Sequence, residues 1–266
     1  MSVKCRDIMW FMEDLAPAAY AEEWDNPGLN VGNPDADVKK ILVALDATEA
    51  VIDEAVEIGA DMIITHHPLL FHSVKQINWD KPIGRKVMKL IKNDINMFAA
   101  HTNLDAANGG TNDRLAELIG LKNMQVVAEH PDGIGILRTG TFDEDITTGI
   151  LAVRVKEALG LDAVRVAGNL SKKVGKVTIC TGAGMSFLND VIKEKCDVFI
   201  TADIRYHETQ DALDAGLVLI DGTHYGTENI IVPKVAEYIR KKLEARYVDD
   251  VEVTESKIDG QTFVHI

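Results

Sequence analysis

The chain has 266 residues and is acidic, with a formal net charge of −14 at pH 7. Hydrophobic residues make up 46% and charged residues 26%, as in an ordinary globular protein that buries a large core in one big domain or two lobes. The acidic balance disfavours direct DNA binding, because contacts to phosphates need clustered Lys and Arg.

The N-terminus and the cysteines exclude further classes of protein. Residues 1–24 carry several charges and no uninterrupted apolar run, which argues against a signal peptide, and no apolar stretch is long enough to span a membrane. We therefore expect a cytoplasmic protein without membrane contact. Cys5, Cys180 and Cys196 show no CxxC spacing, so we expect buried free thiols rather than a zinc knot or a disulfide framework.

Helices and strands are predicted to alternate along the chain. In chain order we expect a helix at about 4–16, a turn at 25–28, a strand at 40–45, a helix at 49–59, a strand at 61–65, a helix at 84–93, a strand at 96–100, a helix at 111–119, a β-rich stretch at about 124–142, a strand near 200, a strand at 217–221 and a helix at about 229–246. Gly59 suits the end of its helix, and Thr111 suits an N-cap after two glycines. The alternation indicates an α/β fold with a largely parallel sheet.

An internal repeat supports this fold class. Residues 40–65 align without a gap to residues 176–201, and both segments read as strand, helix and strand. The identical pairs are Lys40/Lys176, Ala47/Ala183, Asp61/Asp197, Ile64/Ile200 and Thr65/Thr201. Two βαβ units would share much of this pattern by physics alone, and we favour a real duplication over that alternative. We expect a first lobe at 1–125, completed by 223–266, and a second lobe at 126–222.

Three segments place potential metal ligands directly after predicted strands. They are His66-His67-Pro68, His101-x-x-x-Asp105 and His224-x-x-x-Glu228. In an α/β protein, sites are built at the carboxyl ends of the strands. An isolated His-His pair is more often a pair of hydrogen-bonded core or loop histidines, and the first-turn position of Glu228 is favoured by the helix dipole alone. The three segments together favour a metal site over these alternatives.

The set of predicted ligands indicates the chemistry. His66, His67, Asp105, His224 and Glu228 offer three imidazoles and two carboxylates, which suit Zn²⁺, Mn²⁺, Fe²⁺, Co²⁺ or Ni²⁺. Five ligands shared by two divalent ions leave open positions for water or substrate, which is typical of catalytic rather than structural sites. The expected reaction is a hydrolysis in which a metal-activated water attacks carbon or phosphorus.

Other residues near the predicted strand ends have open roles. His101 could be a ligand, a group that orients a ligand or a proton shuttle. Asp25, Asp46 and Asp203 could support the ligands from behind, although an N-cap at Asp203 is an alternative. The glycines in 182–184 could cradle a phosphate, but a tight turn between strand and helix is the interpretation that we favour.

The motifs together resemble the YbgI-like, or Nif-three-like, family, whose members are often labelled GTP cyclohydrolase 1 type 2. The residues that carry the resemblance are Asp25-Asn-Pro-Gly-Leu29, Thr65-His-His-Pro-Leu69, His101-Thr-Asn-Leu-Asp105, Thr201-Ala-Asp203 and His224-Tyr-Gly-Thr-Glu228. The resemblance implies two pseudo-symmetric α/β lobes with largely parallel or mixed sheets, a dinuclear centre on the five ligands named above, and a toroidal homohexamer. Longer members insert an extra domain between the halves, which this chain is expected to lack.

The family label also implies an activity. It is the opening of the imidazole ring of GTP with release of formate, with His101 as the residue that could move protons. We therefore expect a metal-dependent hydrolase with a small-molecule substrate such as a nucleotide or a related heterocycle. The alternative is a non-catalytic metal-binding scaffold or regulator that acts through protein or nucleic-acid partners, because a fold does not determine a function.

Overall fold

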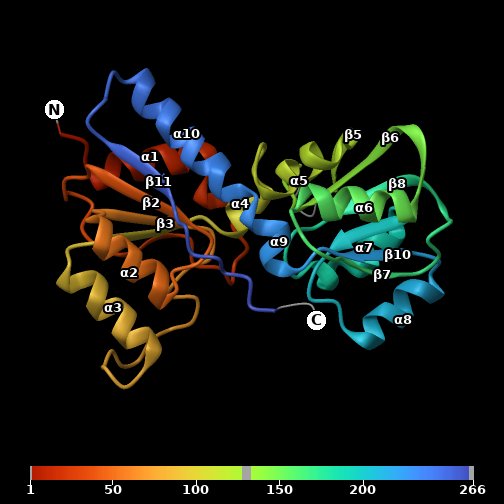
Figure 1. The fold of residues 1–266 in the computed structure, drawn as a ribbon, viewed down its shortest axis with the longest axis horizontal. Coiled ribbons are helices and arrows are strands. Elements are labelled where there is room, and N and C mark those ends of the chain that lie inside the picture. Colours follow the sequence, from red (N-terminus) through yellow and green to blue (C-terminus); the bar gives the residue numbers. More distant parts are fainter. Residues whose placement is uncertain (1, 128–132, 264–266) are drawn as a thin grey trace. The chain divides into compact units, whose positions relative to one another are not determined.

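The computed structural model describes residues 2–127 and 133–263, and the chain divides into two compact units. The first unit consists of residues 1–107 and 231–260, and the second of residues 108–230 and 261–266. Each unit has its own sheet with helices packed against it (Figure 1). The sequence analysis placed the boundary near residue 125, whereas α5 (Thr111–Ile119) and β5 (Lys122–Val127) here belong to the second unit.

The first unit is built on a five-stranded, mostly parallel sheet in the order β1-β4-β3-β2-β11. The strands are β1 (Gly28–Val31), β2 (Lys40–Ala44), β3 (Met62–Thr65), β4 (Asn96–Ala99) and β11 (Glu252–Glu255). Only the edge strand β1 runs antiparallel to its neighbour. Strands β3 and β4 are buried at every position, as expected for parallel strands covered on both faces.

Helices cover both faces of this sheet (Figure 1). They are α1 (Cys5–Leu15) and α10 (Ile231–Ala245) on one face, and α2 (Glu49–Ile58) and α3 (Pro82–Lys92) on the other. The core on the α2 side contains Leu42, Ile52, Ile63 and Leu90. Helix α2 ends as predicted, with Gly59 in the left-handed conformation at φ +68°. A short 3₁₀ helix, η1 (Ala18–Tyr20), and α4 (Thr102–Ala106) complete the unit.

The second unit has a six-stranded mixed sheet in the order β5-β6-β8-β9-β10-β7. Its further strands are β6 (Leu137–Thr147), β7 (Arg165–Ala167), β8 (Lys173–Ile179), β9 (Val198–Thr201) and β10 (Val218–Asp221). Strands β8, β9 and β10 are parallel to one another. The pairs β5/β6, β6/β8 and β7/β10 are antiparallel. The two mixed α/β units confirm the predicted fold class.

The helices of the second unit cover its sheet in a similar way. They are α5, α6 (Thr148–Ala158), η2 (Gly184–Phe187), α7 (Leu188–Lys193), α8 (Tyr206–Asp214) and α9 (His224–Asn229). Leu115 and Ile119 of α5 and Leu151 of α6 share one core cluster with Val198 and Ile200 of β9. Helix α8 lies on the opposite side of the sheet from α6 (Figure 1).

One local prediction needs correction. The N-cap of α5 is Gly110 rather than Thr111, and the Asp113 carboxylate in the first turn accepts a hydrogen bond from the Gly109 N–H at 2.6 Å. The helix predicted at about 229–246 is confirmed as α10, and the separate helix α9 precedes it across Ile230. The β-rich stretch at 124–142 contains parts of β5 and β6, and its residues 128–132 lie outside the described residues.

The internal repeat is visible in the hydrogen bonds. Asp61 precedes β3, and its carboxylate accepts hydrogen bonds from the backbone N–H groups at 39–40, at 2.7 and 2.9 Å. Asp197 precedes β9 and accepts from the N–H groups at 175–176, at 2.9 and 3.1 Å. Two equivalent aspartates therefore join equivalent strand pairs in the same way, with β2-α2-β3 corresponding to β8-α7-β9.

The strand register places the two His-x-x-x-carboxylate segments, at 101–105 and 224–228, one residue out of step with each other in the repeat. Thr65 pairs with Ala99 across β3 and β4, and Thr201 pairs with Asp221 across β9 and β10. Because the two threonines are equivalent, the segment that begins at 101 corresponds to one that begins at 223. The two His-x-x-x-carboxylate segments are thus similar in spacing but not at equivalent positions of the repeat.

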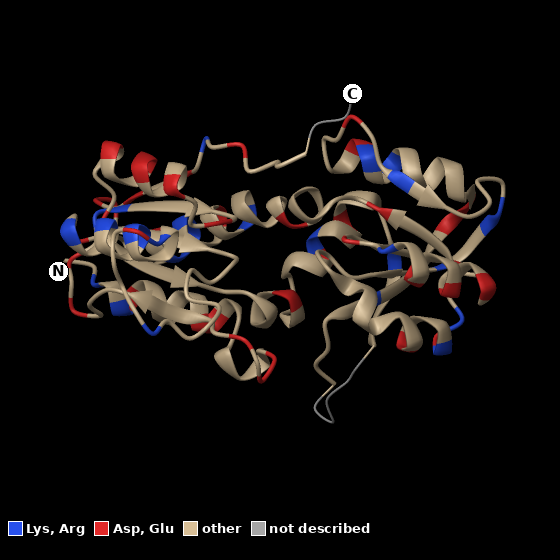
Figure 2. Cartoon of the chain, turned by 90° about the horizontal axis from the view of Figure 1, so that it is seen from below, with Lys and Arg blue, Asp and Glu red and all other residues tan. Residues whose placement is uncertain are grey.

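The charged residues and the cysteines lie where an ordinary globular protein places them. Lys and Arg are interspersed with Asp and Glu in both units (Figure 2). All three cysteines are buried and free, and burial raises the pKa of Cys5 to about 11. Among the helices of residues 2–127 and 133–263, none is long and apolar enough to cross a membrane.

Candidate metal centre

The parallel strands of the first unit deliver imidazoles from their carboxyl ends. His66 and His67 follow β3 directly, and His101 follows β4 after one intervening alanine. The neighbouring strands β3 and β4 run parallel, so these ends meet at one edge of the sheet. Asp105 comes from α4, which begins just after His101. The sheet thus brings together four of the predicted site residues.

Each of these three imidazoles is held through its Nδ1 atom. The His66 Nδ1 lies 2.9 Å from the carbonyl oxygen of Ala100. The His67 Nδ1 lies 2.8 Å from Oδ1 of Asp46, and the His101 Nδ1 lies 2.8 Å from Oδ1 of Asp25. A carbonyl or carboxylate oxygen accepts a hydrogen bond from Nδ1–H, so the ring lone pair lies on Nε2. This arrangement is typical of histidines that bind metals through Nε2.

The held imidazoles face one another. His66, His67 and His101 each offer one ligand atom, and these atoms all lie within 4.8 Å of one another. The Nε2 atom of the buried His66 also lies 3.5 Å from Oδ1 of Asp105, which is buried too. This cluster of nitrogen and oxygen donors could hold a divalent metal ion.

Asp25 connects His101 to the start of α4. Its carboxylate is shielded from solvent and also accepts hydrogen bonds from the N–H and the hydroxyl of Thr102. Burial by itself would raise the pKa of Asp25, but the hydrogen bonds from His101, Thr102 and the Asn26 N–H outweigh it and lower this pKa to about 2. Asp25 therefore stays ionised and orients the His101 ring.

The second unit repeats this arrangement with different residues. His224 and Glu228 lie four residues apart on α9, and the His224 Nε2 is 3.1 Å from Oε2 of the buried Glu228. The His224 Nδ1 lies 2.8 Å from Oδ2 of Asp203, which follows β9. The alternative of an N-cap at Asp203 is wrong, because α8 begins at Tyr206 and Arg205 occupies its N-cap position.

The turn before η2 makes room for Glu228. Gly182 follows β8 with φ +64°, and a Cβ atom at this position would lie 2.0 Å from Oε1 of Glu228. Gly184 is also enclosed, since its Cβ would lie 2.6 Å from Oγ1 of Thr201. The glycines therefore serve the tight turn that the sequence favoured. The contact with Glu228 was not foreseen, because the sequence signal at Gly182 was that of an ordinary turn.

The donor chemistry fits the predicted metals. The six side chains are imidazoles and carboxylates, which suit Zn²⁺, Mn²⁺, Fe²⁺, Co²⁺ or Ni²⁺. Four imidazoles have oxygen partners on Nδ1, three of them carboxylates. Asp25, Asp46 and Asp203, which the sequence offered only as possible supporting groups, are the three carboxylates. Such partners fix the ring orientation and raise the basicity of the ligand nitrogen.

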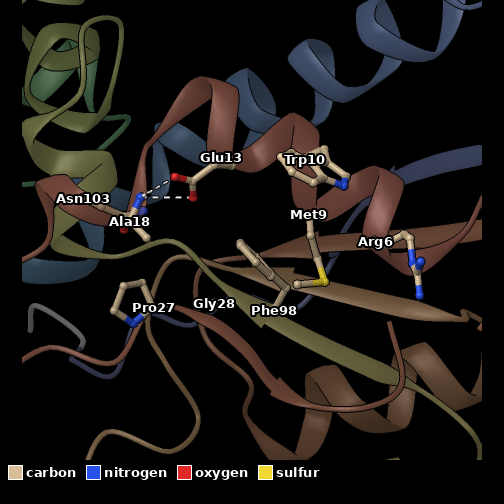
Figure 3. A pocket seen from close by; sticks show the side chains of 9 residues that line it. All are labelled: Arg6, Met9, Trp10, Glu13, Ala18, Pro27, Gly28, Phe98 and Asn103. Atoms are coloured by element: carbon tan, nitrogen blue, oxygen red, sulfur yellow. Dashed lines mark hydrogen bonds between the residues drawn. The ribbon is translucent and has the colours of Figure 1, made fainter. Parts of the chain in front are cut away.

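A separate cavity in the first unit has a different character. It measures about 500 Å³ and lies beside α1, β1 and β4 (Figure 3). Met9, Trp10 and Phe98 make its lining largely apolar, and Glu13 accepts hydrogen bonds from the N–H of Ala18 at 3.1 and 3.2 Å. Because its one carboxylate serves to cap η1, we place the candidate chemistry at the histidines rather than here.

Comparisons with known proteins agree with this picture. A family model described as Duf34/NIF3 (NGG1p interacting factor 3) matches residues 3–261. A Clostridium perfringens protein named GTP cyclohydrolase 1 type 2 homolog is 39% identical over 257 residues, which cover 96% of this chain and 97% of that protein.

Two solved structures show the same fold. A Bacillus cereus protein related to NIF3 superposes with a TM-score of 0.92 at 27% identity, and the match covers 100% of both chains. Reduced HcgD from Methanocaldococcus jannaschii superposes with a TM-score of 0.81 at 32% identity, covering 97% of this chain and 99% of that one.

Proposed function

Because the chain belongs to the Duf34/NIF3 family, we propose that it is a divalent-metal-dependent hydrolase that acts on a nucleotide or a related heterocycle. The observation that carries the proposal is the set of four imidazoles whose Nδ1 atoms are all held by oxygen acceptors. Histidines with purely structural roles have no need of a common orientation. The name of the Clostridium perfringens relative suggests a GTP cyclohydrolase-like reaction.

We assign the metal ligands to His66, His67 and Asp105 in the first unit and to His224 and Glu228 in the second. They would hold two divalent ions per chain. Bound divalent ions supply positive charge that polarises the scissile group and makes water a better nucleophile at neutral pH. The protein contributes the fixed orientation of each donor, through the carbonyl and carboxylate partners described above.

His101 is the residue that we propose moves protons. It lies in the same cluster as His66 and His67, and Asp25 holds its Nδ1 at 2.8 Å. Its Nε2 is then the atom that takes or gives a proton, and the ionised Asp25 stabilises the ring when it is charged. The same orientation would also suit a ligand, so the role of His101 has to be separated from that of Asp105 by experiment.

Metal analysis of single variants tests the ligand assignment. We expect about two ions per chain in the wild type and a clear loss in His67→Ala and Glu228→Ala. His207→Ala is the matched control, because His207 is exposed and its ring bonds Gln210 within α8. If each variant loses both ions, the two sets of ligands share them; if each loses one, the sets bind separately. Unchanged occupancy in both variants would refute the assignment.

A second comparison separates the proton shuttle from the ligands. With GTP as the first substrate, His101→Ala should keep its metal and lose turnover by about 10²–10⁴-fold, while Asp105→Ala should lose metal. If His101→Ala loses metal as readily as Asp105→Ala, then His101 is a ligand and the shuttle role is wrong. Metal binding without turnover in a broad substrate screen would favour a scaffold instead.

The homohexamer implied by the family resemblance stays a prediction. Light scattering at micromolar protein concentration should report about six chains per particle, because closed symmetric rings are a common form of assembly. A stable monomer at that concentration would contradict it.

A further inference from the structure

Two aromatic side chains stand beside the candidate proton shuttle and remain exposed. The ring centroids of Trp24 and Phe71 lie 6.1 and 6.0 Å from that of His101. Trp24 is 59% exposed and Phe71 is 40% exposed, although large apolar rings are usually buried. The two rings are 5.7 Å apart at an angle of 62°, so they do not stack on each other. Together they form an aromatic wall next to His101.

Hydrogen bonds of the residues that follow Trp24 and precede Phe71 hold this aromatic wall in place. Directly after Trp24, the Asp25 carboxylate bonds His101. The next residue, Asn26, donates its side-chain amide to the carbonyl of Leu70 at 2.7 Å, and the Leu70 N–H donates to Asn30 at 3.1 Å. These two hydrogen bonds join the loop that carries Trp24 to the loop that carries Phe71. The residues that follow Trp24 thus hold His101 and the loop that carries Phe71.

We propose that Trp24 and Phe71 form a stacking subsite for the planar ring of a purine-type heterocycle, with the reacting part of the ring beside His101. This inference rests on the proposed function and names its substrate class. A planar ring gains stacking energy on exposed aromatic faces, whereas an aliphatic group gains only burial. The neighbouring imidazoles and Asp105 suit a ligand that is polar at its other end. An aromatic wall beside polar donors therefore matches a heterocycle better than a purely apolar ligand.

Binding of GMP and of ribose 5-phosphate to metal-loaded protein tests the subsite. The two probes share sugar and phosphate, and only GMP carries the ring. GMP should bind at least tenfold more tightly than ribose 5-phosphate. Trp24→Ala should weaken GMP binding by about 5- to 150-fold, the range for loss of one stacked base, and should leave ribose 5-phosphate binding unchanged.

Substitutions of different shape separate stacking from bulk. Trp24→Phe keeps an aromatic face and should retain most of the GMP affinity, whereas Trp24→Leu keeps apolar volume and should lose it. Trp79→Ala is the matched control, because Trp79 belongs to the same unit and is similarly exposed at 55%. Phe71→Ala should weaken GMP binding in the same direction as Trp24→Ala. If Trp24→Leu binds GMP as well as the wild type, the stacking role is wrong.

Metal content and particle size, measured on the same samples, identify which proposal fails. If the wild type binds metal but binds GMP no better than ribose 5-phosphate, the subsite is refuted and the metal assignment stands. If the wild type binds no metal, the proposed function fails first. If Trp24→Ala changes the oligomeric state and leaves GMP affinity intact, the wall is an interface between copies of the chain and the subsite is again refuted.

Discussion

The contact between Gly182 and Glu228 allows the ligand role of Glu228 to be tested without altering Glu228 itself. In Gly182→Ala, the new Cβ would lie 2.0 Å from Oε1 of Glu228 and 3.3 Å from Nε2 of His224. The backbone of Gly182 has little freedom to retreat. Its N–H donates to Oγ1 of Thr227 at 2.9 Å, and its carbonyl accepts from the N–H of Ala202 at 2.8 Å. The carboxylate of Glu228 must therefore move.

The loss of unfolding free energy expected in Gly182→Ala has two parts, and a control variant can separate them. Alanine at φ +64° costs about 1–2 kcal/mol in the backbone. Gly160 has the same φ of +64° in the same unit with nothing within 4 Å of its Cβ position, so Gly160→Ala shows the backbone part alone. Overpacking against Glu228 adds about 1–3 kcal/mol in Gly182→Ala. Displacing one ligand should also weaken metal binding by at least about tenfold, which Gly160→Ala should not do.

Denaturant unfolding of the metal-free proteins and competition titration with a chelator measure these two quantities. Shortening the side chain in Gly182→Ala/Glu228→Asp should relieve part of the stability loss, and the double-mutant cycle gives the coupling between the two positions. If Gly182→Ala loses no more stability than Gly160→Ala and binds metal like the wild type, then Glu228 does not occupy the place that the structure assigns to it.

Two further predictions concern the carboxylates behind the imidazoles. Asp46→Ala removes the acceptor of His67 Nδ1, so metal affinity in a chelator competition should fall by about 10- to 100-fold; an unchanged affinity would show that His67 needs no such support. The pKa of Asp25 is lowered to about 2 in the folded chain, below its usual value, so its stabilisation is fully present above about pH 4 and is lost as the pH falls towards 2. The full loss amounts to about 2.5 kcal/mol, and about 2 kcal/mol of it falls above pH 2, where the folded carboxyl is still half ionised. The difference in unfolding free energy between wild type and Asp25→Asn, followed by denaturant titration from pH 5 to 2, should therefore shrink by about 2 kcal/mol; a constant difference would contradict it.

The sequence predicted the fold well where periodicity and turn chemistry acted together. Helix α2 and strands β2 and β3 were found within a residue or two, because β-branched runs, helical spacing and Gly59 all agree there. Strand β11 was not predicted, since it is a short exposed edge strand whose place beside β2 depends on the tertiary fold. Residues 102–106 also gave no helical periodicity, because α4 is only five residues long and every one of them is buried.

The residues of the site could be predicted as types, but their partners could not. The residue pattern indicated His and carboxylate at strand ends, and the structure places His66, His67 and Asp105 there in one unit. The pairing of three of the four imidazoles with an aspartate depends on contacts far apart in sequence, such as that between Asp25 and His101. The Trp24 and Phe71 wall was missed for the same reason, because isolated aromatic residues in loops carry no pattern.

The two copies of the repeat hold different residues at equivalent positions. By the alignment of residues 40–65 with 176–201, continued into the loops, the position of Asp46 corresponds to that of Gly182, and the position of His67 to that of Asp203. Asp46 therefore carries a carboxylate at the position where Gly182 has no side chain and the Glu228 carboxylate fills the space. His67 offers a ligand nitrogen at the position where Asp203 supports His224. Copying Asp46 into the second copy as Gly182→Asp would not supply another carboxylate to hold an imidazole, because the new side chain would displace the Glu228 carboxylate. Equivalent positions of the two copies carry residues that fit different neighbours, so exchanging a residue between them should damage the site rather than duplicate it.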